Sequence, residues 1–294
     1  MSQSYLNLLT NRIAWSPPDS VRDRPIMGAV MGQHSTLIVE TGASPAHANQ
    51  FRAALTELHP AMPRFAMLTH WHWDHVFGTS TMKLPTIAHV ETRRHVQEMA
   101  RLDWRDNALN TRLAAGHELA FIIDHMRVEM TNIERAALVI SVPELAFTEQ
   151  VEVDLGDLTA QIIHVGGDHA RDSSIVFIPE ERVAFLGDCY YSGFIGIDRF
   201  YTMARLLPLL DQLEALPVDY YLLSHNPDPM PRAEFLHEAG RLRRIGAAVE
   251  QTGGDRTAAQ AALTNASAEP FDEYAYEDLE AFLRGLQPDI GLAY

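Results

Sequence analysis

The sequence predicts an α/β fold, and three observations support this prediction. Short apolar runs alternate with helical patterns along most of the chain, and helices dominate its C-terminal part. This order is typical of layered α/β folds rather than of all-β sandwiches. Hydrophobic residues make up 47% of the 294 residues, enough to bury a sizeable core. No repeat, low-complexity tract or Gly/Ser linker divides the chain, so a single domain over residues 1–294 is expected.

Seven short apolar runs are predicted to be strands, because they are β-branched or aromatic in character and most are bounded by Gly, Pro, Asp or Asn. They are Thr36–Val39, Phe65–Leu68, Thr86–His89, Leu158–Val165, Ser174–Ile178, Val183–Leu186 and Tyr220–Leu223. We expect these runs to be buried, so the polar residues that directly follow them stand at strand ends.

Helical patterns lie between and after these runs. At Ser44-Pro45 a serine N-cap precedes a proline in the first turn, and this helix is expected to run to about Leu58. Further helices are predicted over Glu91–Trp104, Asn107–Met130, Arg205–Leu216, Arg232–Val249 and Tyr276–Leu286. Residues at about 91–134 are interpreted as a helical insertion, which either caps the strand ends or packs at the periphery. Residues at about 231–294 are predicted to form C-terminal helices.

The charge of the chain argues against several classes of partner. The formal net charge is -16, and such a surface repels the phosphates that dominate nucleic-acid binding. The small basic cluster of Arg241, Arg243 and Arg244 is typical of a solvated helix face. We therefore expect a small-molecule substrate and no nucleic acid.

Membrane insertion and disulfide formation are not expected either. No run of about 18 apolar residues is present, so no transmembrane helix is predicted. Cys189 is the single cysteine, which excludes an intramolecular disulfide. Residues 1–15 lack the charged start and apolar stretch of a signal peptide, so a cytoplasmic location is expected.

The most informative motif is Thr69-His70-Trp71-His72-Trp73-Asp74-His75, directly after the predicted strand Phe65–Leu68. His70 and His72 are two residues apart, so on an extended backbone they project in the same direction. Asp74 and His75 follow at a turn and can face a neighbouring point. Imidazole and carboxylate groups together suit zinc, iron or manganese. The motif therefore predicts a metal site.

Three other polar positions follow predicted strands. Gly166-Gly167-Asp168-His169 comes after Leu158–Val165, Gly187-Asp188 ends Val183–Leu186, and Ser224-His225 ends Tyr220–Leu223. Each position alone is weak support for a metal site, because loop histidines are usually hydrogen-bonded structural residues. As a series they predict ligands that converge from several strand ends onto one rim.

This series resembles the metallo-β-lactamase superfamily, whose pattern is H-x-H-x-D-H, a histidine preceded by glycine, G-D and a final histidine. The matching residues are His70, His72, Asp74, His75, His169, Asp188 and His225. The resemblance covers roughly residues 37–225 and implies an αββα four-layer sandwich with metals at one edge. It also implies that His70, His72 and His169 hold one ion. Asp74, His75 and His225 would hold another, with Asp188 bridging the two.

The chain departs from the family pattern in two places. Glu40-Thr41-Gly42 stands where many members have Asp-Thr-Gly, and we expect Glu40 to do the same supporting work. The gap between His75 and His169 is also longer than in compact members, in agreement with the helical insertion. Neither departure affects the ligand set.

The resemblance implies a binuclear metal-dependent hydrolase that uses a metal-bridging hydroxide. Two divalent ions are expected, with Zn²⁺ preferred and Mn²⁺ or Fe²⁺ as alternatives. An ester, thioester or lactone is the preferred substrate class. Asp74 is the candidate catalytic residue for accepting and returning a proton, because it is both a ligand and close to the hydroxide.

Tyr191 is a second candidate catalytic residue, three positions after Asp188. In the acyl-homoserine lactonases of this superfamily a tyrosine at that offset helps to bind the lactone carbonyl oxygen. A phenol there can donate to a developing oxyanion. The alternative is that Tyr190 and Tyr191 pack behind the site.

Other residues near the motifs are expected to have supporting roles. Trp71 and Trp73 alternate with the histidines and should point away from the metals, at least one of them into the core. Cys189 is interpreted as a small buried residue. Asp172 or Ser173 is a candidate for orienting the histidine of the glycine turn. The remaining histidines are interpreted as surface or structural residues: His34, His47, His59, His89, His95, His117, His125, His164 and His237.

Several alternatives remain open at the level of sequence. A mononuclear iron oxygenase similar to the persulfide dioxygenases keeps the same ligands, and a small-molecule phosphodiesterase fits the fold. A flavodiiron protein is disfavoured, because that group usually has Glu at the position of His72. A secreted β-lactamase and an inactive scaffold are disfavoured by the complete ligand set. The apolar residues in Asp289–Tyr294 leave a homo-oligomer open.

Overall fold

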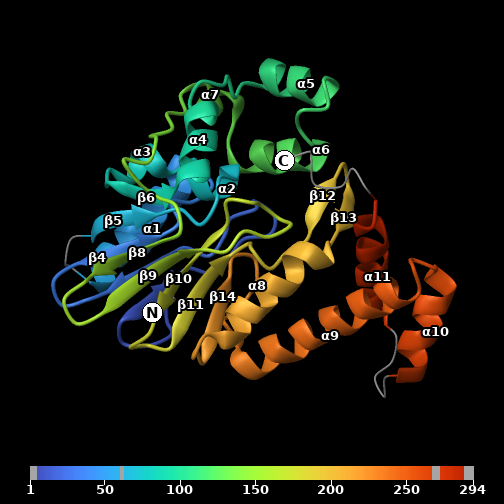
Figure 1. The fold of residues 1–294 in the computed structure, drawn as a ribbon. Helices are drawn as coiled ribbons and strands as arrows, with labels where there is room; N and C mark the ends of the chain where they lie inside the picture. Colours follow the sequence, from blue (N-terminus) through green and yellow to red (C-terminus); the bar gives the residue numbers. More distant parts are fainter. Residues whose placement is uncertain (1–4, 60–62, 267–271, 288–294) are drawn as a thin grey trace.

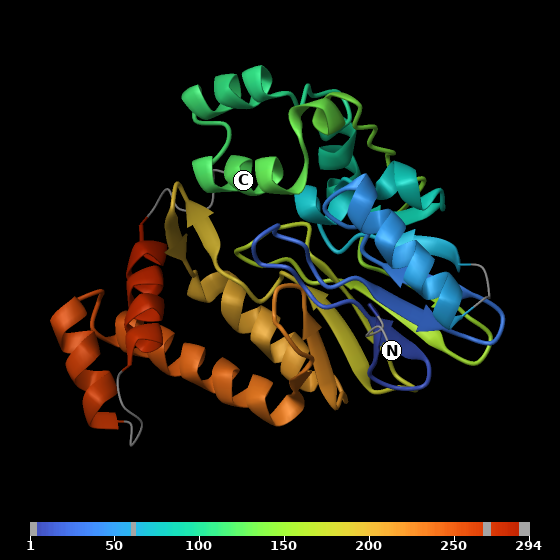
Figure 2. The same cartoon turned by 180° about the vertical axis from the view of Figure 1, so that it is seen from behind.

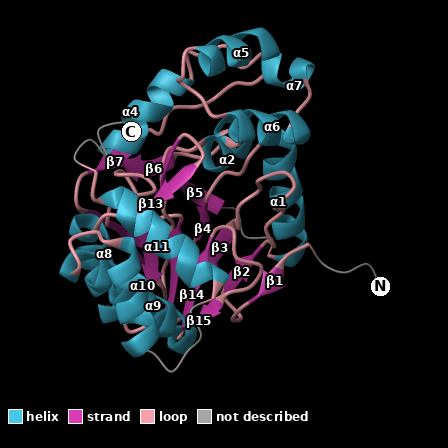
Figure 3. Ribbon diagram, turned by 90° about the vertical axis from the view of Figure 1, so that its right-hand side faces the viewer, coloured by secondary structure: helices cyan, strands magenta, loops and turns pink. Residues whose placement is uncertain are grey.

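The structure, a computed structural model, describes residues 5–59, 63–266 and 272–287. Two β-sheets pack face to face in the middle, and helices cover the outer face of each sheet (Figures 1 and 3). The α/β class and the αββα layer order predicted from the sequence are confirmed.

The first sheet has seven strands in the order β1-β2-β3-β4-β5-β6-β7. They are β1 (Asn7–Leu8), β2 (Ile13–Trp15), β3 (Gly28–Met31), β4 (Thr36–Val39), β5 (Pro63–Met67), β6 (Thr86–His89) and β7 (Leu145–Phe147). Strands β1 to β4 pair antiparallel, and β4 to β7 pair parallel. The carboxyl ends of β4, β5 and β6 therefore meet at one edge of the sheet.

The second sheet has six strands in the order β15-β14-β11-β10-β9-β8. They are β8 (Gln150–Asp154), β9 (Thr159–His164), β10 (Ser174–Ile178), β11 (Val183–Gly187), β14 (Tyr220–Leu223) and β15 (Met230–Pro231). Strands β11 and β14 are parallel neighbours, whereas β9 and β11 each pair antiparallel with β10. The carboxyl ends of β9, β11 and β14 therefore lie at the same edge.

Alternating side chains explain how the sheets bury both faces. On β4, Leu37 and Val39 join the core between the sheets, together with Phe185 and Leu222 of the second sheet. Ile38, which lies between them in sequence, points the other way into a second core beneath a helix. A strand buried on both faces reads as a continuous apolar run, and this is why the strand was predicted with its correct bounds.

Helices cover the two outer faces. The first sheet carries α1 (Pro45–Leu58), α2 (Trp73–Val76) and α3 (Thr79–Met82), and Figure 2 shows α1 lying along this sheet. The second sheet carries α8 (Met203–Ala215) and α9 (Arg232–Gln251), followed by α10 (Arg256–Ala266) and α11 (Glu273–Gly285). The predicted start of α1 is confirmed, because the Ser44 hydroxyl accepts a hydrogen bond from the His47 N–H at 3.0 Å.

The buried imidazole of His47 makes the stability of the fold depend on pH. Its Nδ1 accepts a hydrogen bond from the Ala43 N–H at 3.3 Å, which only a neutral ring can do. Burial, and then the charge of Arg24, lowers the pKa of His47 to about 3 from 6.5. Between these values the unfolded chain binds the proton and the folded chain does not. The contribution of the neutral His47 ring to the free energy of unfolding is therefore complete above pH 6.5, and it is lost as the pH falls towards 3.

We expect the free energy of unfolding of the metal-free protein to fall as the pH is lowered from about 7 to about 4. His47 should contribute to this slope the amount that corresponds to about one proton taken up on unfolding. The full effect of this group is at most about 5 kcal/mol. In His47→Asn, whose side-chain oxygen can replace Nδ1 as acceptor, that part of the slope should disappear. Urea unfolding at several pH values measures it, and identical slopes in both proteins would contradict the assignment.

The insertion between β6 and β7 consists of α4 (Val90–Met99), α5 (Asp106–Ala114), α6 (Ala120–Glu129) and α7 (Asn132–Ala136). The predicted continuous helix over Asn107–Met130 was wrong, since the chain turns between α5 and α6. The turns let the helices fold back around their own core, in which Trp104, Leu109 and Ile123 are buried. An apolar helical period alone does not reveal such a turn.

A small hairpin, β12 (Gly193–Ile195) and β13 (Asp198–Phe200), lies between α6 and α11 (Figure 1). The Arg284 side chain of α11 donates to the Arg199 carbonyl at 3.1 Å, and the Tyr201 N–H donates to the Ala281 carbonyl at 3.1 Å. Phe194 of the hairpin contacts Phe121 of α6, with ring centroids 5.7 Å apart. The C-terminal helix thus supports a hairpin that reaches the insertion.

The strands missed from sequence are short or carry weak patterns: β1, β2, β3, β7, β8, β12, β13 and β15. Helices α2, α3 and α10 were also missed. The C-terminal residues 289–294, considered above for a partner contact, lie outside the described residues. Within the described part of the chain, no helix has both the length and the apolar character needed to span a bilayer.

Candidate metal centre

The seven residues predicted as ligands come together at the shared edge of the two sheets. His70 and His72 follow β5, Asp74 and His75 lie in α2, His169 lies between β9 and β10, Asp188 follows β11 and His225 follows β14. Their donor atoms form two groups, and within each group all atoms lie within 4.8 Å of one another. The first group contains three histidines, and the second contains two aspartates and two histidines.

Two glycines allow the ligand loops to approach so closely. Gly187 has φ +57°, and a Cβ there would stand 2.4 Å from the Thr69 hydroxyl, so any side chain would push the Asp188 loop away from the His70 loop. Gly167 has φ +142°, and its Cβ would stand 2.7 Å from the Cys189 carbonyl oxygen. The glycines noted in the sequence before His169 and Asp188 are therefore required by this packing.

The first group is formed by His70, His72 and His169. His72 Nδ1 and His169 Nε2 lie 2.9 Å apart. His70 Nε2 is buried and has no hydrogen-bond partner within the described structure. Buried polar atoms normally have a hydrogen-bond partner, so this nitrogen is available to bind a cation or to accept a hydrogen bond.

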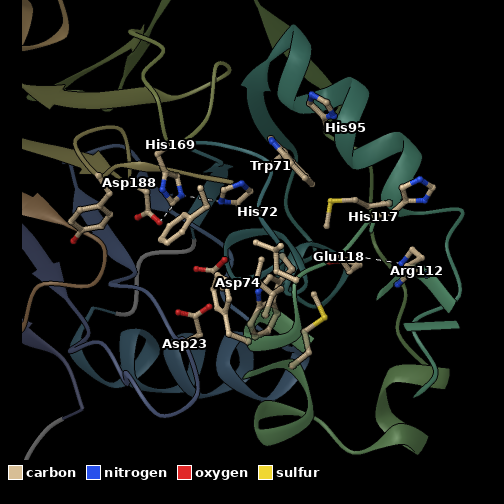
Figure 4. A pocket seen from close by; sticks show the side chains of 18 of the residues that line it. Asp23, Trp71, His72, Asp74, His95, Arg112, His117, Glu118, His169 and Asp188 are labelled. Carbon is tan, nitrogen blue, oxygen red and sulfur yellow. Dashed lines mark hydrogen bonds and ion pairs between the residues drawn. The ribbon is translucent and has the colours of Figure 1, made fainter. Parts of the chain in front are cut away.

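The second group is formed around Asp74. Its Oδ2 lies 2.9 Å from His75 Nε2 and 3.3 Å from His225 Nε2. His75 and Asp74 are buried, whereas His225 retains about a quarter of its side-chain exposure. Figure 4 shows Asp74 and Asp188 on the same side of the pocket as His72 and His169.

Asp188 joins the two groups. A single oxygen, Oδ2, lies 3.3 Å from His169 Nε2 and 3.9 Å from His70 Nε2. The same oxygen lies 3.4 Å from His225 Nε2 and 3.5 Å from His75 Nε2. Asp188 Oδ2 is thus placed to be shared between two ions.

The carboxylates and the histidines of the second group shift one another's pKa values. Burial alone would raise the pKa of Asp74, but His75 and His225 hold it below its usual value. Burial would likewise raise the pKa of Asp188, and the same two histidines hold it well below. The carboxylates in turn raise the pKa of His75 and of His225 well above the usual value, against the effect of burial. Two ionised carboxylates at this point favour a cation.

The histidines of the first group are neutral near neutral pH. Burial, and then the charge of His169, lowers the pKa of His72 to about 3. Burial also lowers the pKa of His70 and of His169. A neutral imidazole has a free lone pair, which is the form that binds a metal.

These residues fit a pair of divalent ions. Around an ion with metal–nitrogen distances of about 2.0–2.1 Å, ligand atoms of a tetrahedral site stand about 3.3 Å apart. The Asp188 Oδ2 distances of 3.3 to 3.9 Å lie close to that spacing. Nε2 of His70, which has no hydrogen-bond partner in the described structure, lies 3.9 Å from the same carboxylate oxygen. The donor set therefore supplies what one ion in each group would need.

Glu40 supports His75 from behind. Its Oε2 lies 3.2 Å from His75 Nδ1, and the next residue, Thr41, donates its hydroxyl to the His75 carbonyl at 2.6 Å. Both Glu40 and His75 are buried. A carboxylate on the far nitrogen of a ligating imidazole fixes its tautomer and orientation. This agrees with the supporting role expected for Glu40.

Glu40→Gln is expected to weaken metal affinity by about 10–100-fold, because the amide removes the negative charge that holds the His75 ring. Competition with a chromophoric chelator measures this affinity. Glu152→Gln, on the exposed edge strand β8, serves as the control and should bind metal as the wild type does. Equal affinity in Glu40→Gln and wild type would remove Glu40 from this role.

The other histidines are oriented by different groups. His70 Nδ1 lies 3.1 Å from the Thr69 hydroxyl, and His169 Nδ1 lies 3.3 Å from the Ser192 carbonyl oxygen. The expectation that Asp172 or Ser173 orients His169 was wrong. The Asp172 carboxylate instead accepts a hydrogen bond from the Thr92 hydroxyl of α4 at 2.7 Å.

Tyr191 lines the cavity beside the metal centre, but its hydroxyl is engaged by the protein. It donates to Asn226 Oδ1 at 3.0 Å and accepts from the His225 N–H at 3.2 Å. A phenol has one proton to donate. Within this geometry Tyr191 holds the loop that carries His225, and donation to a substrate would require the Asn226 bond to break.

Tyr191→Phe is therefore expected to lower kcat/KM by less than about tenfold, whereas loss of a true oxyanion donor costs about 10²–10³-fold. The change should also reduce stability by about 1 kcal/mol, since Asn226 loses its donor. Steady-state kinetics and urea unfolding measure the two effects. A hundredfold loss of kcat/KM with unchanged metal content would restore the oxyanion role predicted by resemblance.

The tryptophans of the motif have different environments. Trp73 is buried and packs against Phe77 with ring centroids 5.6 Å apart, which confirms that one tryptophan is a core residue. Trp71 is half-buried and stacks on His95 at 4.9 Å. Cys189 is buried as expected, and it belongs to neither of the two groups of candidate ligands.

A cavity of about 600 Å³ opens from the metal centre towards the insertion. His72, Asp74 and His225 line it at one end. His95 and His117, interpreted from sequence as surface or structural residues, also line it. Asp23 was not predicted, because no local motif marks this residue of the N-terminal region, whose Oδ1 lies 3.8 Å from His225 Nδ1.

Comparisons with known proteins agree with this architecture. The chain is similar to a metallo-beta-lactamase from Pontibacter korlensis, with 14% identity and a TM-score of 0.56 over 81% of this chain and 98% of that chain. It is similar to a metallo-beta-lactamase family protein from Thermus thermophilus, with 18% identity and a TM-score of 0.53 over 82% and 83% of the two chains. A metallo beta lactamase from Erythrobacter litoralis has 16% identity and a TM-score of 0.53 over 82% and 97%. The curated proteins contain no match.

At these identities the solved structures show a shared fold. The family model described as the metallo-beta-lactamase superfamily matches residues 29–225. That range is more than half of the 294 residues, and it includes every position from His70 to His225 that forms the two groups. The chain therefore belongs to the metallo-beta-lactamase superfamily.

Proposed function

We propose that this protein is a hydrolase that uses two divalent metal ions to cleave a small ester, thioester or lactone. The observation that carries the proposal is the position of Asp188 Oδ2, which lies among imidazole nitrogens of both ligand groups. In the proposed arrangement His70, His72 and His169 hold one ion. Asp74, His75 and His225 hold the other, and Asp188 binds both.

When bound, two divalent ions supply Lewis acidity and lower the pKa of a coordinated water towards neutrality. The chain supplies the remaining functions. In this proposal Asp74, which is ionised and lines the cavity, accepts a proton and returns it to the leaving group. The largely apolar wall beyond it excludes water from the substrate, which strengthens electrostatic interactions within the site.

Zinc is the metal that we propose first, because the ligands are imidazole nitrogens and carboxylate oxygens. Elemental analysis of protein purified without added metal or chelator tests this. About two zinc or manganese ions per chain support the binuclear site. One iron per chain would favour a mononuclear oxygenase, and no uptake on reconstitution would contradict the site.

The activity is tested with a panel of small esters, thioesters and lactones, followed by pH-stat titration of the acid released. We expect turnover that is lost on chelation and restored by the metal found in the analysis. Bis(4-nitrophenyl) phosphate serves as the phosphodiester comparison. Turnover that persists after chelation with no metal remaining would contradict the proposal, and turnover of the phosphodiester alone would overturn the substrate class.

A further inference from the structure

The cavity beside the metal centre has a composition that points to one class of substrate. Its volume of about 600 Å³ lies within the range of about 300–1,000 Å³ that is usual for sites of drug-sized ligands. Figure 4 shows the metal-binding side chains on one side of it and Arg112, His117 and Glu118 on the opposite side. A substrate bound at the metals therefore extends into a space larger than the hydrolysed group needs.

The wall of this space is mostly apolar. Trp71 comes from the ligand loop, Trp104 from the insertion, Phe121 and Ile122 from α6, and Phe194 from β12. The ring centroids of Phe121 and Phe194 lie 5.7 Å apart, so this pair connects the insertion to the hairpin. The insertion, whose role the sequence left open, contributes much of this wall.

The charged groups of the wall disfavour an anionic substrate. Arg112 lies 3.4 Å from Glu118 and stacks over the Trp104 ring at 4.8 Å. Arg199 lies 3.1 Å from Glu277 and 3.2 Å from Asp278. Each of these arginines thus pairs with a carboxylate, and one guanidinium nitrogen, Nη2 of Arg112, is buried without a hydrogen-bond partner in the described structure.

Two further carboxylates, Asp23 and Glu98, line the same cavity and add negative charge. Phosphate-bearing substrates are usually held by several arginine or lysine donors, whereas this wall leaves a single guanidinium nitrogen, Nη2 of Arg112, without a partner in the described structure. An uncharged substrate group fits this wall better than a phosphate does.

We propose that the substrate carries a large uncharged apolar group, an alkyl chain or an aromatic ring, which occupies this cavity while the scissile carbonyl lies at the metal centre. This inference rests on the proposed hydrolase function. Burying apolar surface in the cavity contributes binding energy in proportion to the area removed from water.

Two ester series test the proposal with the metal-loaded protein. In one, the acyl chain of 4-nitrophenyl esters is lengthened from acetate to decanoate. In the other, the alcohol of acetate esters is lengthened from methyl to decyl. We expect kcat/KM to rise by about threefold to fourfold per buried methylene in one of the series. Equal kcat/KM along both series would overturn the proposal.

A matched pair of variants on α6 locates the binding surface. Ile122 lines the cavity, whereas Val128 of the same helix is 51% exposed and does not line it. Ile122→Asn should lower the ratio of long-chain to short-chain kcat/KM by about tenfold or more, because a polar amide meets the chain. Val128→Asn should leave the ratio unchanged. Phe194→Gln tests the part of the wall formed by the β12 hairpin, without changing a residue of α6.

A binding measurement separates this inference from the proposed function. The neutral fluorophore N-phenyl-1-naphthylamine should bind the metal-loaded wild type and be displaced by decanol, and it should bind Ile122→Asn more weakly than Val128→Asn. If no ester is cleaved but this binding pattern holds, the hydrolase proposal fails and the apolar site stands. If esters are cleaved without chain-length preference and the fluorophore binds all variants equally, the apolar site fails and the hydrolase stands.

Discussion

Asp188→Ala is expected to remove both metal ions and to lower kcat/KM by at least about 10³-fold, equivalent to about 4 kcal/mol of transition-state stabilisation. The reason is geometric, since one oxygen of Asp188 lies 3.3 to 3.9 Å from imidazole nitrogens of both groups. Without that carboxylate each group loses a shared anionic ligand. Elemental analysis after dialysis measures metal content, and kinetics on the best ester of the panel measures turnover.

Asp188→Asn refines this result, because it keeps the shape of the side chain and removes only its charge. We expect it to retain less than one ion per chain and to be nearly as inactive as the alanine variant. Asp219→Ala is the matched control, since Asp219 is exposed and pairs with Arg182 away from the site. Two ions and wild-type turnover in Asp188→Ala would contradict a shared ligand at this position.

The sequence was sufficient where the determining interactions are local. Four strands, β4, β6, β10 and β14, have the bounds predicted from their apolar runs. All of their residues except Tyr220 are buried, so each strand corresponds to an unbroken run of buried residues in the sequence. The ligand motif is equally local, because His70 and His72 stand two residues apart and Asp74 and His75 lie in the following turn.

The sequence was insufficient where a contact joins distant segments. Asp23 reaches His225 from a distant part of the chain, and Ser192 offers its carbonyl to His169 across two loops. The Tyr191 hydroxyl finds Asn226, a residue that no motif marks. Such partners depend on the order of β9, β10, β11 and β14 within the second sheet, which the local sequence pattern does not encode.

The insertion illustrates the same distinction for the substrate site. Helical periodicity indicated that residues 91–134 form helices, but the turn between α5 and α6 decides which face lines the cavity. Ile122 and Val128 lie on one helix, and only the folded arrangement separates the cavity residue from the exposed one. Substrate selectivity is therefore a tertiary property of this chain.

Asp74→Ala is expected to abolish turnover, with a loss of at least about 10³-fold in kcat/KM. Two losses combine here. The Asp74 Oδ2 atom, 2.9 Å from His75 Nε2 and 3.3 Å from His225 Nε2, is a proposed ligand of the second ion. The same carboxylate is the proposed proton acceptor, ionised at neutral pH because His75 and His225 hold its pKa low. Kinetics together with metal analysis measures both effects.

Asp74→Asn separates the two roles of this residue. The amide keeps an oxygen that can bind a metal but cannot accept the proton, so reconstitution at high metal concentration should restore two ions without restoring turnover. If Asp74→Asn with two ions bound turns over at the wild-type rate, Asp74 is a ligand alone. The proton must then be accepted by another group at the cavity wall, such as Asp23, whose Oδ1 lies 3.8 Å from His225 Nδ1.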